Sequence, residues 1–245
     1  MSRQKCETVK IAVVGTGSKG NAYLVQVGDS KLLLDAGMPA AKVRAFNQNK
    51  IADINAMLVT HAHNDHAHFM EEFMNMGVRL IYTTGEIDCG NFKVYGEYQK
   101  HDIECRGYHV DFPDKGIMLH YITDTVEPIV SAEYLQTDRR HYWIIECDYC
   151  EKTMAYNDEH ESASVAMRNA RTRETHLSDR TVIDFFKRDN VPVDAILFVH
   201  KSALNFDYKL FNSEWNKELP RLSMAVAENG ARYEMHGKRI DRVLI

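Results

Sequence analysis

The sequence predicts a layered α/β fold, because strand-like runs come in two groups with helical runs interspersed. Apolar or alternating runs bounded by Gly, Asp or Asn are typical of strands, and apolar residues three or four positions apart are typical of helices. No Pro- or Gly-rich linker, internal repeat or low-complexity tract marks a boundary, and single domains reach about 250 residues. We therefore expect one domain spanning residues 1–245.

The predicted elements follow one another along the chain. Strands are predicted at 11–14, 22–27, 31–37, 56–60, 80–82, 92–95, 116–123, 142–147 and 195–200. Helices are predicted at 40–46, 68–77, 162–171 and 178–188, the last with Ser178 or Asp179 as its N-cap. Within 222–235, two alternating runs are joined by Asn229-Gly230, a dipeptide typical of tight β-hairpins.

Composition narrows the class of protein. The net charge of −5 argues against a protein that coats long nucleic acid with a general basic surface. No apolar run approaches the roughly 20 residues that cross a bilayer, and the first ten residues are too polar for a secretory signal.

The cysteines are Cys6, Cys89, Cys105, Cys147 and Cys150. They are too scattered for a disulfide framework, and the last two lack the further ligands of a structural zinc site. We expect a cytoplasmic protein with free thiols and no membrane partner.

A glycine-rich segment after the first strand resembles a nucleotide-binding motif in its letters alone. Residues 15–20 read GTGSKG and match G-x-G-x-x-G. In that motif the last glycine opens a helix whose N-terminus meets a pyrophosphate. Gly20 instead leads into another strand-like run, so we interpret the glycines as a tight connection between neighbouring strands.

The most informative segment is THAHNDHAH at 60–68, directly after an apolar run. Histidines two positions apart cannot share a helix face. A loop that curls round an ion can aim His61 and His63 at one site while Asp65 and His66 turn to a second. Two metal ions roughly 3.5 to 4 Å apart form a recurring site for hydrolysis. The alternatives, a polar surface loop or a fortuitous histidine tract, are disfavoured by H-x-H-x-D-H directly after an apolar strand.

Together with LLLDAG, KHD, ITDT and ILFVHKS, this motif resembles the metallo-β-lactamase superfamily, and the resemblance covers most of the chain. It implies a four-layer αββα sandwich with two divalent metal ions, zinc or manganese, as cofactors. The implied ligands are His61, His63 and His101 for one ion, Asp65, His66 and His200 for the other, and Asp124 as the bridge. The resemblance also implies that Asp35 is not a ligand itself but lies behind the ligating histidines and orients them. His109 and His120 are alternatives to His101, but KHDIECRGY favours His101 and leaves them as strand residues.

Two further segments resemble YycJ- and WalJ-like exonucleases and tRNase Z, and the anti-Pycsar phosphodiesterases are similar in fold and length. ETHLSDRTVIDF resembles their GHLSN segment, which implies that His176 is a proton donor. YWIIECDY resembles a strand that implies Glu146 as its orienting carboxylate and Asp148 as a lining residue. The candidate catalytic residues are thus Asp65, His176 and Glu146. The plain alternatives are a helix-capping histidine and a glutamate paired with a surface arginine.

A cluster of cations lies near these residues. Arg168, Arg171 and Arg173 come just before the histidine of THLSD, and Lys201 follows the last implied ligand. The planar guanidinium of arginine pairs well with phosphate oxygens, and the lysine ammonium binds phosphate as a positive charge. We therefore take Arg168, Arg171 and Lys201 as candidate phosphate-binding residues. A solvated helix face is the alternative for each arginine.

Phosphodiester hydrolysis needs an activated water, neutralised phosphate charge and a protonated leaving group, and these residues can supply all three. Acyl hydrolysis can use the same metals, so the resemblance and the cations decide the prediction. We predict a dinuclear hydrolase of nucleotide or nucleic-acid phosphodiesters, a YycJ-like exonuclease first. The alternatives are a cyclic-nucleotide phosphodiesterase resembling phage anti-Pycsar enzymes and a non-catalytic metal-binding module. The sequence leaves open the metal, a homodimer, and a bacterial or phage origin.

Overall fold

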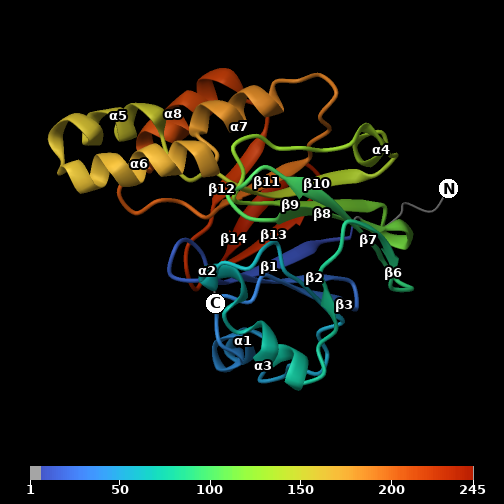
Figure 1. The fold of residues 1–245 in the computed structure, drawn as a ribbon. Coiled ribbons are helices and arrows are strands. Elements are labelled where there is room, and N and C mark those ends of the chain that lie inside the picture. The colour runs from blue at the N-terminus through green and yellow to red at the C-terminus, as the bar shows by residue number, and fades with distance from the viewer. Residues whose placement is uncertain (1–6, 245) are drawn as a thin grey trace.

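The structure, a computed structural model, describes residues 7–244, so Cys6 lies outside the described residues. Two seven-stranded β-sheets pack face to face, and helices cover the outer face of each sheet (Figure 1). The predicted four-layer αββα fold is confirmed. Among the described residues, no helix has the length and apolar character needed to cross a membrane.

The first sheet contains both ends of the described chain. Its strand order is β14 (Arg239–Val243), β13 (Arg232–His236), β1 (Val9–Gly15), β2 (Ala22–Val27), β3 (Ser30–Leu34), β4 (Ala56–Leu58) and β5 (Leu80–Ile81). The pairs from β14 to β3 are antiparallel, and the pairs from β3 to β5 are parallel.

The second sheet is built from the middle of the chain. Its order is β12 (Ser223–Val226), β11 (Ala195–Val199), β10 (Arg140–Glu146), β9 (Ile117–Ile122), β8 (Cys105–Phe112), β7 (Lys93–Gln99) and β6 (Gly85–Asp88). The pairs from β12 to β9 are parallel, so these strands end at the same edge of the sheet.

The helices divide between the two outer faces. On the side of the first sheet lie α1 (Ala40–Phe46), α2 (Asn64–Ala67) and α3 (Met70–Asn75). The other helical segments are η1 (Pro113–Lys115), α4 (Ala132–Leu135), α5 (Glu151–His160), α6 (Ala163–Thr175), α7 (Asp179–Phe186) and α8 (Tyr208–Glu218). Figure 1 shows α5 to α8 together above the second sheet.

Three apolar clusters account for the layers. The largest lies between the sheets and joins residues such as Val13 of the first sheet to Leu197 of the second. Leu33 belongs to a cluster under α1 and α3, and Trp143 belongs to one under α7 and α8. Because these strands are buried on both faces, they appear in the sequence as continuous apolar runs.

The predicted strands and helices are found with ends shifted by a few residues, and Ser178 is the N-cap of α7. The glycine segment connects β1 and β2, which pair antiparallel, as predicted. Gly20 has φ +135, and a Cβ there would lie 2.4 Å from the carbonyl oxygen of Gly37. The strands β6 and β14, the helices α5 and α8, and the short helices α2 and α4 were not predicted from the sequence. In α5 only Met154 and Asn157 are buried, so the helix has little apolar periodicity.

The predicted hairpin at Asn229-Gly230 is wrong. The chain turns there, but β12 pairs in parallel with β11 of the second sheet, whereas β13 pairs with β1 of the first. The Ala227 N–H donates to the Phe198 carbonyl (2.7 Å), and the Gly230 N–H donates to the Val13 carbonyl (2.9 Å). The turn therefore carries the chain from one sheet to the other. A local turn signal cannot show this, because the strands that accept the two runs are distant in the sequence.

Three buried histidines form a hydrogen-bonded row on the helix-covered face of the second sheet. His109 Nδ1 lies 2.8 Å from His120 Nδ1, and His120 Nε2 lies 2.9 Å from His141 Nδ1. The row ends at Thr137 Oγ1, 3.1 Å from His141 Nε2, and at Glu97 Oε2, 3.4 Å from His109 Nε2. A neutral imidazole has one donor and one acceptor nitrogen, so the row suits three neutral rings. Burial lowers the pKa of all three histidines.

This row predicts a loss of stability in mild acid. Below about pH 6.5 the unfolded chain binds protons on these histidines while the folded chain does not, so protonation favours unfolding. His120→Gln should flatten the pH dependence of the free energy of unfolding by up to about 1.4 kcal/mol per pH unit between about pH 6.5 and 5. Urea titrations in chelator measure it, with the exposed His160→Gln as control. Parallel curves for wild type and His120→Gln would contradict the lowered pKa.

Candidate metal centre

A cleft at one end of the sandwich collects residues that follow strands of both sheets. Its volume is about 280 Å³, and its lining includes Asp65, Asp124, Arg171, His176 and His200. These residues come from the segments after β4, β9 and β11 and from the C-terminal part of α6 with the residue that follows it. Segments far apart in the sequence therefore meet in this cleft.

The backbone at this end is unusual at three positions. Asp35, Asp124 and His200 have φ of 58, 53 and 53, and they follow β3, β9 and β11. A left-handed backbone is uncommon in residues other than glycine and often occurs at functional sites. The backbone thus marks the ends of these three strands as candidate functional positions.

The first group of potential metal donors contains three histidines and one aspartate. His61 Nε2 and His101 Nε2 lie 3.0 and 3.4 Å from His63 Nδ1. Asp124 Oδ2 lies 3.7 Å from His61 Nε2 and 3.9 Å from His101 Nε2. Donors that bind zinc tetrahedrally at about 2.0 to 2.1 Å lie about 3.3 Å from one another. The four side chains therefore fit one metal ion.

The second group contains Asp65, His66 and His200. Asp65 Oδ2 lies 3.3 Å from His66 Nε2 and 3.4 Å from His200 Nε2. The other oxygen of Asp124, Oδ1, lies 3.3 and 3.9 Å from the same two nitrogens. One carboxylate thus faces both groups, and the structure brings together all seven residues that the resemblance implies as ligands.

Acceptors behind the rings orient these histidines. His66 Nδ1–H donates to Asp35 Oδ2 (2.6 Å), and His101 Nδ1–H donates to the carbonyl of Thr175 (3.1 Å). An acceptor on the far nitrogen fixes the tautomer and leaves a lone pair on the nitrogen that faces the cleft. Asp35 is fully buried and acts from behind the ring, which is the position that the resemblance implies for it.

Buried carboxylates make the centre favour positive charge. Burial opposes protonation of His66, yet Asp124 and Asp35 raise its pKa to about 10. Burial also opposes protonation of His200, yet Asp124 above all raises its pKa well above the usual range. Burial, aided by the neighbouring His66, lowers the pKa of His61 to about 2. Positive charge is thus favoured near the carboxylates, and a divalent cation is one way to supply it.

His176 faces the cleft from the junction of α6 and α7. Its Nδ1–H donates to Glu146 Oε1 (2.7 Å), and Glu146 is fully buried. Although burial opposes it, Glu146 raises the pKa of His176 to about 9. The ring can therefore carry a proton at neutral pH. His176 and Glu146 also form, with Asp124 and His200, a further set of donors close enough for a metal, so the role of His176 needs a test.

The candidate phosphate-binding cations are not equally placed. Arg171 lines the cleft, whereas the cleft lining does not include Arg168 or Lys201. Arg168 is exposed on α6, one turn before Arg171, and Lys201 is partly exposed. Arg173 forms an ion pair with Asp158 instead.

Three contacts in the centre were not found from the sequence. Tyr121 OH donates to Asp35 Oδ2 (2.5 Å), and Asn21 Nδ2 lies 3.0 Å from His66 Nε2. Asp102 Oδ1 lies 3.1 Å from His101 Nε2. The polar residue directly after GTGSKG was a signal for Asn21. Tyr121 sits in an apolar strand, where no pattern distinguishes it from a core residue.

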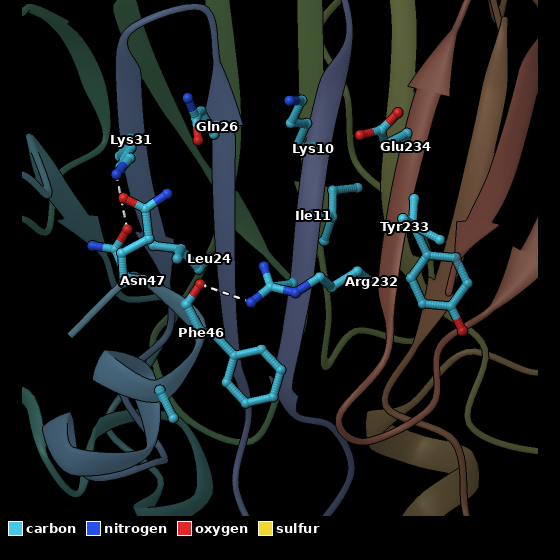
Figure 2. Close-up of a pocket in the computed structure, with 14 residues that line it drawn as sticks. Lys10, Ile11, Leu24, Gln26, Lys31, Phe46, Asn47, Arg232, Tyr233 and Glu234 are labelled. Atoms are coloured by element: carbon cyan, nitrogen blue, oxygen red, sulfur yellow. Dashed lines mark hydrogen bonds between the residues drawn. The ribbon is translucent and has the colours of Figure 1, made fainter. Parts of the chain in front are cut away.

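A larger cavity, of about 420 Å³, lies against the end of α1 on the outer face of the first sheet (Figure 2). Two of its cations already have partners: Lys31 Nζ donates to Asn47 Oδ1 (2.8 Å), and Arg232 Nη2 donates to the Phe46 carbonyl (2.9 Å). Its lining, within the described chain, includes no histidine. Convergent acid–base groups, rather than size, therefore identify the smaller cleft as the candidate site.

Comparison with known proteins agrees with this geometry. Residues 15–78, which include the H-x-H-x-D-H segment, match the metallo-β-lactamase superfamily. YhfI of Bacillus subtilis, a metallo-β-lactamase fold protein, superposes with a TM-score of 0.69 at 14% identity, covering 93% of this chain and 99% of YhfI. The chain therefore has the same fold as this metallo-β-lactamase fold protein. The short form of human tRNase Z shares the fold, with a TM-score of 0.59 at 14% identity over 91% of this chain and 98% of that one.

The sequence relatives of this chain match over a short stretch. Exodeoxyribonuclease WalJ of Streptococcus pneumoniae is 36% identical over 62 residues, which is 24% of this chain and 23% of WalJ. Exodeoxyribonuclease YycJ of Bacillus anthracis is 41% identical over 58 residues, which is 22% of each chain. The matched part thus spans less than a quarter of the length of these nucleases.

The contact between Asp35 and His66 predicts a role in metal affinity. Asp35→Asn should weaken metal binding about 10- to 100-fold, because the amide lacks the charge behind the ring, and asparagine tolerates the left-handed backbone. Competition with a chelating dye measures the affinity. Tyr121→Phe, which removes one donor to the same carboxylate, should have a smaller effect. Wild-type affinity in Asp35→Asn would show that the carboxylate does not support the ligand.

Proposed function

We propose that the protein is a metal-dependent hydrolase of phosphodiester bonds that acts on nucleic acid. The observation that carries the proposal is the cleft itself. Two groups of donors share Asp124, and the same cleft holds His176 and Arg171. Metal binding, proton transfer and anion recognition can therefore act on the same phosphodiester group of a substrate.

The donor sets fit two divalent ions. His61, His63 and His101 would hold one ion, Asp65, His66 and His200 the other, and Asp124 would contact both. When bound, two divalent ions supply an acidic water and offset the charge of phosphate oxygens. Zinc and manganese both suit histidine and carboxylate donors.

The chain's own residues perform the remaining steps. Asp65, whose side chain is 25% exposed, would orient the attacking water. Glu146 holds His176 with a proton available toward the cleft, and His176 donates it to the departing alkoxide. Arg171 offers N–H groups from the rim to a phosphate oxygen.

The sequence relatives support a nucleic-acid substrate, because both are named exodeoxyribonucleases. Arg168 lies one turn before Arg171 on α6, and Arg171 lines the cleft. Two cations in a row can contact successive phosphates of a single strand. A cyclic-nucleotide phosphodiesterase is the second candidate, because a cleft of about 280 Å³ is small enough for a single nucleotide.

His176→Ala separates a proton donor from a ligand. The variant should keep the wild-type metal content, measured by elemental analysis, but lose roughly 10²- to 10⁴-fold in rate on substrates with poor leaving groups. On bis-p-nitrophenyl phosphate the loss should be much smaller, because p-nitrophenolate leaves without a proton. Loss of one metal per chain would make His176 a ligand instead.

Salt dependence separates the two candidate substrates. A strand that contacts several phosphates binds with a log K that falls by about 0.7 per contact for each tenfold rise in salt. We expect cleavage of single-stranded DNA from an end, weaker at physiological salt and weaker still in Arg171→Gln. Arg168→Gln should reduce the slope of log K against log salt by about 0.7, the contribution of one phosphate contact. Rapid hydrolysis of 3′,5′-cyclic mononucleotides with oligonucleotides untouched would favour the second candidate.

A further inference from the structure

Asp102 lies at the rim of the cleft, between the first donor group and α6. Its Oδ1 lies 3.5 Å from His63 Nε2 and 3.1 Å from His101 Nε2. Its other oxygen, Oδ2, accepts a hydrogen bond from Arg171 Nη2 (2.5 Å). One side chain thus contacts candidate metal ligands and the cation at the mouth of the cleft.

The contact with His63 completes a pattern among the ligand rings. His63 turns Nδ1 into the first donor group, so its Nε2 points away from that group. The rings that turn Nε2 inward have their own partners on Nδ1: Thr60 for His61, Asp35 for His66 and the Thr175 carbonyl for His101. The Thr175 carbonyl already holds the proton of His101 on Nδ1, so the tautomer open to the influence of Asp102 is that of His63. A carboxylate beside Nε2 of His63 favours the tautomer that carries the proton there, which leaves the Nδ1 lone pair for a metal.

The contact with Arg171 restricts a side chain that is otherwise free to move. Arg171 is 66% exposed, and an ion pair so exposed adds little to stability. Its effect is on position, because a long exposed arginine otherwise samples many rotamers. Holding the guanidinium over the cleft in advance lowers the entropy lost when an anion binds.

We propose that Asp102 is a positioning residue that couples the two halves of the site, holding His63 in its ligand tautomer and Arg171 over the cleft. The part that concerns His63 needs only metal binding. The part that concerns Arg171 rests on the proposed phosphodiester hydrolysis, with a phosphate oxygen as the group that Arg171 meets.

Metal affinity tests the His63 contact without any turnover. Asp102→Ala should weaken metal binding about 10- to 100-fold in competition with a chelating dye. Asp102→Asn keeps an oxygen that can accept from Nε2–H, so it should recover most of the affinity. Arg171→Gln should bind metal as the wild type does. Thermal unfolding of each variant shows whether the fold is retained.

Steady-state kinetics at saturating metal test the Arg171 contact. With a single-stranded oligonucleotide, Asp102→Asn and Arg171→Gln should each raise KM about tenfold while kcat changes little. The double variant should be no worse than Arg171→Gln, because both changes remove the same interaction. Asp158→Asn is the matched control, since it breaks the ion pair of Arg173 on the same helix.

Distinct results overturn each half. If Asp102→Ala is folded and binds metal as tightly as the wild type in competition with the dye, the proposed role at His63 is wrong. Additive KM effects in the double variant, or a tenfold rise in KM in Asp158→Asn, overturn the role at Arg171. If the wild type cleaves no phosphodiester, the proposed function fails together with the Arg171 half, and the dye measurement still decides the His63 half.

Discussion

The buried carboxylate of Asp35 is the contact on which the metal centre depends. It follows β3 of the first sheet, and it accepts hydrogen bonds from Tyr121 of the second sheet and from Thr60 and His66 after β4. A buried charge is stable only when it is fully hydrogen-bonded, so these donors must converge on it. The carboxylate thereby links the two sheets at the end where the cleft opens.

The other donors depend on how the two sheets meet at this end. The first group combines His61 and His63 from the first sheet's side with His101 and Asp124 from the second. Neither sheet alone carries a complete set of ligands. The core between the sheets is apolar, whereas the cleft at its end is rich in carboxylates and histidines. Rigid strands thus position side chains that lie on short segments just beyond them, an arrangement common to catalytic sites.

Helix α6 connects the metal centre to the mouth of the cleft. Its last residue, Thr175, accepts from His101, and Arg171 lies one turn earlier on the side of the cleft. Polar contacts hold this helix: Asn205, on the segment after β11, donates to Asn169 Oδ1 (2.7 Å) and accepts from Asn157 of α5 (2.9 Å). Buried amides need directional partners, so this network fixes α6 more specifically than apolar packing would.

Apolar runs and punctuating glycines predicted most strands, because strands buried on both faces have a plain signature in the sequence. The segment 60–68 pointed to metal binding for a similar reason, since few surface loops need four histidines. Neither α5 nor the sheet-crossing turn at Asn229-Gly230 was predicted. The first has little apolar periodicity, and the second is decided by strand partners that lie far away in the sequence.

The sequence by itself determined a layered α/β class and which residue types gather in the motifs, because burial and metal affinity depend on local chemistry. The αββα arrangement was implied by the family resemblance. Only the tertiary structure decided which residues meet. It brought Tyr121 to Asp35, placed Arg171 at the cleft while leaving Arg168 outside its lining, and set Asp102 against His63. These contacts join residues separated by tens of positions along the chain. They arise from the packing of two sheets and a helix, which no local pattern records.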